Sequence, residues 1–240
     1  MKGRLDVSLI LPCYNEAGLF ATSVARIKGV LDASTYSYEV IFVDDASHDG
    51  TQTRITDYCR SHRAFRNILH SVNAGRGRTV TDGIRAARGT VVGYIDIDCE
   101  VDPIYIPKMI SMILADRADV VIGKRYYRTS PRAMVREILS RGYQWLSDEM
   151  IGTGGLDTET GYKFFSRKKI LSVLPKAKNP GWFWDTEIMV FARGAGLRIL
   201  EEPVLFLRRF DKHSSVNVIR DTGDYLVNLW KLRGRLGKQS

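Results

Sequence analysis

The sequence predicts an α/β protein with a mostly parallel sheet covered by helices. Three observations support this fold class: short β-branched runs alternate with helical patterns, their spacing is that of strand–helix–strand units, and polar residues follow the strand ends. In such sheets ligands bind at the carboxyl ends of the strands. The 240 residues, 44% of them hydrophobic, suit one globular domain.

The first half of the chain is the more regular one. We predict strands at residues 7–12, 38–45, 66–70 and 90–98, with helices at 17–31, 49–60 and 77–88 between them. Strand, helix and strand at this spacing are typical of a parallel sheet covered by helices.

The second half predicts fewer elements. Residues 104–117 and 133 to about 151 have helical patterns, and 118–123 and 198–207 resemble strands. For the aromatic stretch 181–196 we prefer a position in the hydrophobic core to contact with a lipid or sugar. The segment 216–236 is basic and amphipathic, so it predicts a helix that either lies on an anionic membrane surface or packs on the domain.

The charge favours anionic partners. The net charge is +9, and residues 208–240 contain eight basic and three acidic residues. No segment has the ~18 consecutive apolar residues of a membrane-spanning helix. Because the N-terminal residues lead directly into a strand pattern without a cleavage site, we expect a cytoplasmic protein, with peripheral attachment to the cytoplasmic membrane face as one option. Its three scattered cysteines predict free thiols.

Acidic residues cluster where the strand 90–98 ends. Asp96 and Asp98 form an Asp-x-Asp pattern that can share a divalent cation, and Glu100 could add a third oxygen. Mg²⁺ or Mn²⁺ typically takes one or two carboxylates and leaves its other positions to water and phosphate. The bare pattern also fits a solvated turn, and Asp102 before Pro103 suits a helix start.

Two further loops have both a binding and a structural interpretation. Asp44 and Asp45 end the strand 38–45, where they could accept hydrogen bonds from a base or ribose, or could belong to a turn that starts the next helix. The loop 73–77, NAGRG, either lets the backbone approach a phosphate closely or is a flexible turn.

In order and spacing, these pieces resemble the nucleotide-sugar domain of glycosyltransferase family 2, above all its dolichyl-phosphate mannose synthase and polyprenyl-phosphate glycosyltransferase branch. The matching stretches extend over roughly residues 7 to 210: LPCYNE, YEVIFVDDASHDGT, NAGRGRTVTDGI, GYIDIDCEVDP, VVIGKR, DTETGYKFFSR, DTEI and LRILEEPVLFLRR. The resemblance implies a GT-A catalytic domain at 1–210, followed by the basic amphipathic segment 211–240.

The resemblance implies an inverting, metal-dependent enzyme that moves a hexose such as mannose or glucose from a GDP- or UDP-linked sugar to a polyprenyl phosphate. The implied nucleotide-binding residues are Pro12, Tyr14, Glu16, Val43, Asp44, Asp45, Asp96, Ile97 and Arg209. The implied catalytic residues are Asp98, Arg125 and Arg136. The implied metal ligands, for Mg²⁺ or Mn²⁺, are Asp96, Asp98 and Glu100. The arginines would pair with phosphate oxygens.

A phosphate acceptor is ionised near pH 7 and needs no strong base, and we identify no well-marked base. If the acceptor is instead a soluble glycan or metabolite, Asp185 and Glu187 become base candidates. The chain departs from the branch at YYRTSPR and at Ser215, where a lysine is common, so the acceptor and donor sugar stay open. A nucleotidyltransferase would need a glycine-rich phosphate loop after the first strand, which PCYNEAG is not.

The partners that we expect are the nucleotide sugar, polyprenyl phosphate, and a membrane surface or a membrane-anchoring subunit. A basic nucleic-acid-binding module is the rival of a different class. It is disfavoured because the acidic residues gather at strand ends and no nucleic-acid motif with stacked aromatics is present, so we expect no nucleic acid.

Overall fold

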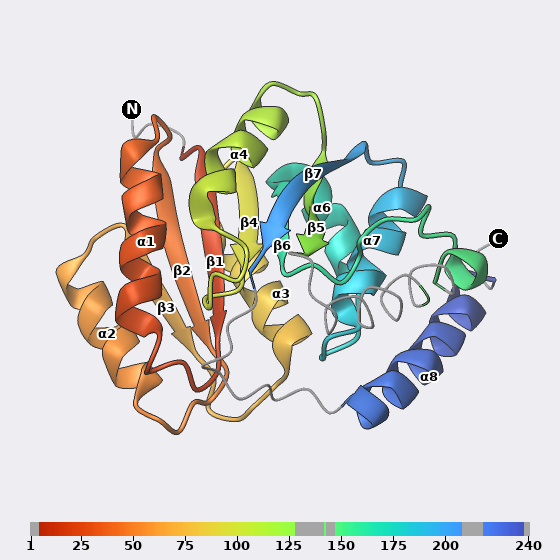
Figure 1. Ribbon diagram of the computed structural model, residues 1–240, viewed down its shortest axis with the longest axis horizontal. Helices are drawn as coiled ribbons and strands as arrows, with labels where there is room; N and C mark the ends of the chain where they lie inside the picture. Colours follow the sequence, from red (N-terminus) through yellow and green to blue (C-terminus); the bar gives the residue numbers. More distant parts are fainter. Residues whose placement is uncertain (1–4, 128–141, 143–146, 208–217, 238–240) are drawn as a thin grey trace.

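A seven-stranded sheet forms the centre of the protein, and helices cover both of its faces (Figure 1). The computed structural model describes residues 5–127, 142, 147–207 and 218–237. The strands lie in the order β3-β2-β1-β4-β6-β5-β7. Their bounds are β1 Val7–Cys13, β2 Tyr38–Asp44, β3 Phe65–Leu69, β4 Val91–Ile95, β5 Val120–Tyr127, β6 Tyr162–Ser166 and β7 Ile199–Phe206. The predicted fold class is confirmed.

Six strands run in one direction and β6 runs in the other. β1 is parallel to β2 and β4, β2 to β3, and β5 to β7, whereas β6 is antiparallel to both of its neighbours, β4 and β5. The carboxyl ends of six strands therefore lie at one edge of the sheet, together with the amino end of β6. We call this edge the carboxyl edge.

The helices divide between two hydrophobic cores, one on each face. α1 (Phe20–Ala33), α2 (Thr51–Ser61) and α4 (Ile106–Leu114) pack on one face, and α3 (Arg76–Ala86), α6 (Arg167–Val173) and α7 (Trp184–Gly194) on the other. Alternate residues of each strand feed the two cores: Leu9 and Leu11 of β1 point to the first, and Ile10 to the second. Two short 3₁₀ helices are also present: η1 (Pro103–Tyr105) precedes α4, and η2 (Leu174–Lys176) precedes α7.

The second half of the chain differs most from the prediction. We assigned no element to residues 152–167, yet Tyr162–Ser166 form β6. The aromatic stretch becomes α7, with Phe183 and Trp184 in the core as predicted and Trp182 59% exposed. Most of the predicted helix at 133–151 lies outside the described residues, and 147–151 are helical.

The C-terminal helix α8 (Val218–Leu236) packs on the domain. Leu229 and Leu232 are buried in the core that α7 also lines, so packing, one of the two predicted alternatives, is confirmed. The same helix exposes Leu226, Val227 and Trp230. Among the described residues, no helix is both long and apolar enough to span a membrane.

Candidate functional site

The carboxyl edge gathers most of the residues that the sequence singled out. The ends of β1, β2, β4 and β5 carry Cys13, Asp44, Ile95 and Arg125 or their neighbours to this edge. Because β6 is antiparallel, the loop 157–161 that precedes it reaches the same edge. The antiparallel direction of β6 therefore places the loop 157–161 at the carboxyl edge, which the sequence pattern did not predict.

The β1 and β2 ends are tied to each other by loop contacts. The side chain of Tyr14 is exposed at the rim, whereas Glu16 is buried and its backbone N–H donates to the Thr51 hydroxyl at 2.8 Å. Pro12 pairs in register with Val43, which is fully buried in the core. Of these predicted nucleotide-binding residues, Tyr14 thus presents the most side-chain surface.

The carboxylates of Asp44 and Asp45 hold backbone turns. Asp44, fully buried, accepts hydrogen bonds from the backbone and hydroxyl of Ser47 and from Gln52 at 2.8 Å, which shapes the turn into α2. Asp45 accepts from the backbone N–H groups of Ala74 and Gly75, both at 2.8 Å. It thereby anchors the loop that leads into α3.

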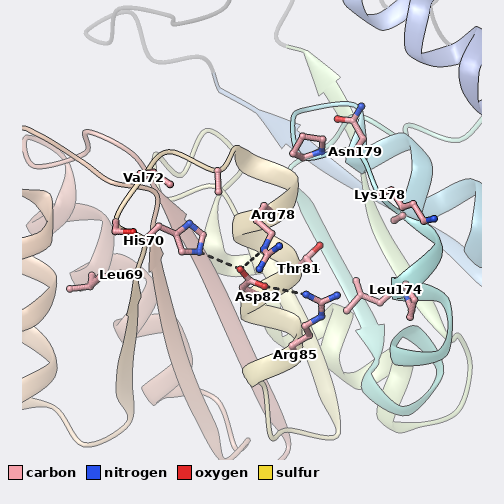
Figure 2. A pocket seen from close by; sticks show the side chains of 15 residues that line it. Leu69, His70, Val72, Arg78, Thr81, Asp82, Arg85, Leu174, Lys178 and Asn179 are labelled. Carbon is pink, nitrogen blue, oxygen red and sulfur yellow. Dashed lines mark hydrogen bonds and ion pairs between the residues drawn. The ribbon is translucent and has the colours of Figure 1, made fainter.

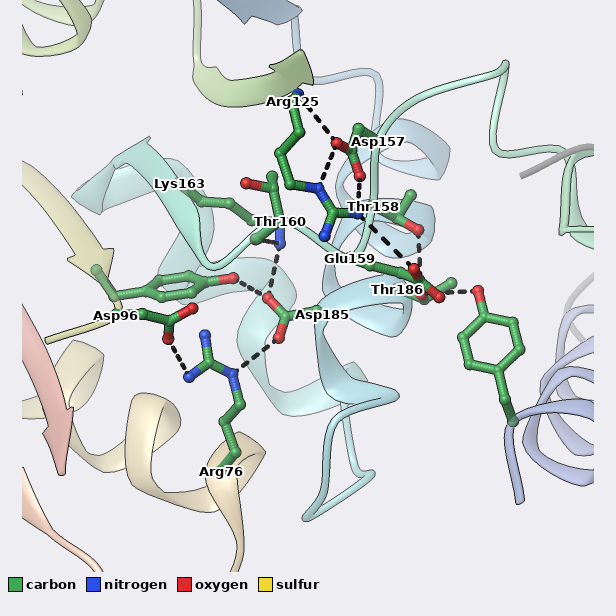
Figure 3. Close-up of polar contacts among 12 residues, drawn as sticks. Arg76, Asp96, Arg125, Asp157, Thr158, Glu159, Thr160, Lys163, Asp185 and Thr186 are labelled. Atoms are coloured by element: carbon green, nitrogen blue, oxygen red, sulfur yellow. Dashed lines mark hydrogen bonds and ion pairs between the residues drawn. The ribbon is translucent and has the colours of Figure 1, made fainter. Parts of the chain in front are cut away.

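The anchored loop delivers Arg76 to the centre of the site. Its guanidinium pairs with the carboxylate of Asp96 and, through Nε at 3.3 Å, with Asp185 (Figure 3). The Trp182 ring covers it at 4.6 Å. The binding interpretation of the loop 73–77 relied on its backbone, whereas in the structure the arginine side chain contacts the acidic strand end.

The acidic turn after β4 is partly exposed. Asp98 Oδ1 accepts from the backbone N–H of Glu100 at 3.3 Å, and Cys99 adopts a positive φ of 54° that tightens the turn. Burial raises the pKa of Asp96 above its ordinary value, Arg76 opposes this, and the neighbouring Asp98 carboxylate raises it further. Ile97 of the same turn is buried.

Within the described residues, no three Asp, Glu, His or Cys side chains lie close enough together to hold a metal ion among themselves. The ligand set Asp96, Asp98 and Glu100 therefore stays a prediction.

Arg125 reaches the other side of the site from β5. Its Nε and Nη2 donate to the two oxygens of Asp157 at 2.8 and 2.7 Å, and Glu159 lies 3.8 Å away. Arg136 and Arg209, the other predicted phosphate-contacting arginines, lie outside the described residues.

The two base candidates of the sequence are both buried. Asp185 accepts from Lys163 at 2.6 Å, from the Tyr94 hydroxyl and from Arg76. Burial acts to raise its pKa, but the two cations and the Tyr94 hydrogen bond hold it below the ordinary value. Glu187 accepts from the backbones of Lys178 and Asn179, both at 2.7 Å. Their carboxylates are thus occupied by ion pairs and backbone groups, which makes either a poor general base.

The sequence missed three polar residues of the site: Asp157, Glu159 and Lys163. Glu159 is partly exposed, and burial raises its pKa; its described contact is the long ion pair with Arg125. A lysine inside the apolar run YKFF was a usable signal, because lysine is rarely buried without a partner. No feature of the sequence indicated that β6 runs antiparallel to its neighbours.

One cavity, of about 640 Å³, lies elsewhere (Figure 2). Asp82 at its wall pairs with Arg78 at 2.7 Å and with Arg85 at 3.3 Å. Its lining contains none of the predicted site residues. The candidate site is therefore identified by the chemistry of the side chains at the carboxyl edge, and not by the size of this cavity.

The protein has the GT-A fold. It superposes with a TM-score of 0.71 on a crystal structure of glucosyl-3-phosphoglycerate synthase from Mycobacterium tuberculosis with Mn²⁺, UDP-glucose and phosphoglyceric acid, at 20% identity, covering 96% of this chain and 80% of that one. A second structure of that enzyme, with Mn²⁺, UDP and glucosyl-3-phosphoglycerate, gives a TM-score of 0.69 at 20% identity, covering 95% and 80%. At this identity the likeness establishes the fold alone.

The sequence then identifies the family. The family model of glycosyl transferase family 2 matches residues 8–172, and the chain belongs to this family. The resemblance stated from its motifs is thereby confirmed.

Its curated relatives include glycosyltransferases of lipid phosphates. Glycosyltransferase AglD of Haloferax volcanii is 28% identical over 233 residues, covering 94% of this chain and 37% of that protein. Two dolichyl-phosphate beta-glucosyltransferases match as well. The Dictyostelium discoideum protein is 25% identical, covering 96% of this chain and 78% of its own length, and the Saccharomyces cerevisiae protein is 28% identical, covering 84% and 66%. The chain thus spans little more than a third of the archaeal relative.

Proposed function

We propose that this glycosyltransferase moves a hexose, with inversion, from a nucleoside-diphosphate sugar to a polyprenyl phosphate, and that it depends on Mg²⁺ or Mn²⁺. The observation that carries the proposal is the pair of carboxylates at the end of β4, Asp96 clamped by Arg76 and Asp98 beside it. The names of two relatives, dolichyl-phosphate beta-glucosyltransferases, support the lipid phosphate and favour glucose over mannose.

The residues at the β4 end fit a divalent cation. Asp96 and Asp98 supply oxygen donors, which Mg²⁺ and Mn²⁺ prefer, and the Asp98 carboxylate lies close enough to raise the pKa of Asp96. Asp96 and Asp98 would hold the ion, with Glu100 as a third candidate. When bound, the ion neutralises charge on the diphosphate leaving group.

The transfer exchanges one bond at C1 of the sugar. An oxygen of the acceptor phosphate forms the new bond to C1 from the face opposite the diphosphate, and the electron pair of the broken C1–O bond leaves with the nucleoside diphosphate. A phosphate monoester is already largely ionised near pH 7, so no side chain has to remove a proton from it. Arg125, fixed by Asp157, would stabilise phosphate charge on the β5 side.

The outer face of α8 suits an anionic membrane surface. Leu226, Val227 and Trp230 form an exposed apolar patch, Trp230 being 73% exposed, and Lys231 and Arg233 flank it. Apolar side chains among basic ones can insert at the headgroup boundary of anionic bilayers. Contact of this kind would bring the site to an acceptor that resides in the membrane.

A panel of donors tests the function. UDP-glucose, GDP-mannose and their base-swapped partners are offered with MnCl₂ or MgCl₂ and a polyprenyl phosphate, and products are identified by mass. We expect metal-dependent transfer to the lipid phosphate, abolished by Asp98→Ala and by chelation. Transfer that survives at full rate in Asp98→Ala would refute the metal assignment, and no lipid-linked product from any donor would refute the acceptor.

A soluble acceptor with a hydroxyl group is the second candidate, and Glu159 favours it. A hydroxyl needs a base, and Glu159 is a partly exposed carboxylate near Arg125 with a raised pKa, in contrast to the ion-paired Asp185. Offering 3-phosphoglycerate and simple glycans beside the polyprenyl phosphate separates the two candidates.

A further inference from the structure

Four charged side chains form a line, that is, a series of three consecutive ion pairs, from the core to the candidate site (Figure 3). Lys163 of β6 donates to Asp185 of α7, Asp185 pairs with Arg76 of α3, and Arg76 pairs with Asp96 after β4. Their side chains are 0%, 3%, 10% and 37% exposed, in that order. Asp96 is thus the member of the line that meets solvent at the site.

Stability alone does not explain this line. Removing a charge from water costs several kcal/mol per ion, and well-packed apolar residues of similar volume are often as stable as a buried ion pair. Lys163 also stands between Tyr162 and Phe164, in a strand whose three aromatic residues are buried in the two hydrophobic cores. We therefore look for a role that depends on the charges of these residues, beyond a contribution to stability.

The contacts leave the inner members little freedom. Asp185 uses both oxygens: Oδ1 accepts from Lys163 at 2.6 Å and from the Tyr94 hydroxyl, and Oδ2 accepts from Arg76 Nε at 3.3 Å. The second described contact of the Lys163 ammonium is the carbonyl of Thr160, in the loop before β6. The rotamer of Asp185 is therefore set from three directions.

Arg76 transmits this order to the site. Its Nε is held by Asp185, the Trp182 ring lies 4.6 Å from its guanidinium carbon, and its Nη1 pairs with Asp96 Oδ1. On the other side of Asp96 is Gly161, where an added Cβ would lie 1.9 Å from Asp96 Oδ2. The Asp96 carboxylate therefore lies between the guanidinium of Arg76, which has contacts on three sides, and the closely approaching backbone of Gly161.

We propose that Lys163 and Asp185 are positioning residues of the glycosyl transfer: through Arg76 they hold the Asp96 carboxylate in the orientation that binds the cation and the nucleotide diphosphate. This inference rests on the proposed role of Asp96. Neither residue touches the substrate. Their effect is the one that outer partners have on metal-binding carboxylates, whose loss typically costs about 10- to 100-fold in metal affinity or activity.

Isothermal titration of the full chain with MnCl₂ and UDP, and with MnCl₂ and GDP, provides the test, because it reads binding without turnover. Asp185→Asn keeps the shape but offers one acceptor oxygen where the structure uses two, and Lys163→Met removes the ammonium. We expect each variant to bind Mn²⁺ and the diphosphate about 10- to 100-fold more weakly than the wild type.

Glu39→Gln is the matched control. Glu39 is also buried and paired with an arginine, Arg66 at 2.9 Å, but it lies at the start of β2, on the edge opposite the site. Its variant should be destabilised in a thermal melt, yet bind within about twofold of the wild type. If Glu39→Gln weakened the binding of Mn²⁺ and the diphosphate equally, the titration would be reporting the loss of a buried charge and not the misplacement of the Asp96 carboxylate.

The double variant Lys163→Met/Asp185→Leu, which leaves no acceptor oxygen at position 185, keeps the test decisive if a single variant does not fold. Losing both charges avoids an unpaired buried ion, so stability should recover relative to the single variants, whereas binding should stay weak because Arg76 has lost its Nε partner. Wild-type affinity in the double variant would overturn the inference.

Asp96→Asn separates this inference from the proposed function. If Asp96→Asn loses binding while Asp185→Asn and Lys163→Met bind like the wild type, the positioning role alone is wrong. If Asp96→Asn itself binds like the wild type, or the wild type binds neither diphosphate, the proposed site is wrong and the positioning role with it.

Discussion

The guanidinium of Arg125 forms two parallel hydrogen bonds to the carboxylate of Asp157, with Nε–Oδ2 at 2.8 Å and Nη2–Oδ1 at 2.7 Å. Asp157 is buried and lies in the loop before the antiparallel strand β6, whereas Arg125 lies at the end of β5. This planar pairing fixes both the position and the plane of the guanidinium, which a lysine could not reproduce.

Arg125→Lys should therefore lower kcat/KM although the charge is kept. A misplacement of about 1 Å in a group that positions the reactants can cost about 100-fold in rate. Steady-state kinetics with the best donor measure the effect. Arg66→Lys, which disturbs an arginine–glutamate pair away from the site, is the control and should leave kcat/KM unchanged. Wild-type kinetics in Arg125→Lys would exclude a role in transfer that depends on its geometry.

Gly161→Ala should disable binding without unfolding the protein. An added Cβ would overlap Asp96 Oδ2 at 1.9 Å and Arg76 Nη2 at 2.7 Å, so the carboxylate must move. Overpacking of this kind costs about 1–3 kcal/mol of stability. Titration with Mn²⁺ and UDP should detect weakened binding, whereas Gly29→Ala, which meets open space on α1, should bind normally. Normal binding by Gly161→Ala would show that the orientation of Asp96 is not critical.

Glu159→Gln should distinguish the two acceptor classes. If the acceptor is a hydroxyl, loss of the base should lower kcat by about 100-fold or more, in the range of general base catalysis. If it is a phosphate, kcat should change by less than about threefold, because no proton is removed. Single-turnover assays with each acceptor measure this difference.

The pH profile of the wild type supplies a second readout for Glu159. Burial raises the pKa of Glu159, so its active, ionised form is lost as the pH falls through that raised value. A hydroxyl-directed reaction should then lose rate on the acid side at a pH above the ordinary glutamate pKa, and Glu159→Gln should abolish that limb. A limb that persists in the variant would belong to another group.

Trp230→Ser should weaken membrane binding and spare transfer to a short, water-soluble polyprenyl phosphate. Trp230 is 73% exposed and adds no contact to the core, so the fold should remain intact. Burying a large apolar side chain contributes about 1.5–3 kcal/mol, so vesicle affinity should fall by about tenfold or more. Cosedimentation with phosphatidylglycerol vesicles tests this, with Val72→Ser, another exposed apolar position, as the control. Equal sedimentation of all three proteins would exclude α8 as the membrane contact.

The class of fold, and the end of the sheet at which the site lies, could be predicted from the order of the residues alone. Repeated β-branched runs and helical patterns predicted a mostly parallel sheet with two covered faces. Asp45, Asp96 and Arg125 lie at its carboxyl edge because each lies close to the C-terminal end of a strand. The ends of strands can be predicted from sequence because they depend on residues that are near one another in the chain.

Which charged side chains form ion pairs could be seen only once the packed elements were known. The direction of β6 brings Asp157 and Glu159 to the site and buries Lys163, and the pairing of Arg76 with Asp96 and Asp185 joins residues up to 109 positions apart. Asp185, a base candidate in sequence, is thereby an ion-pair partner. Such contacts depend on the packing of several elements at once, and the cost of leaving a buried charge unpaired acts only when those elements assemble.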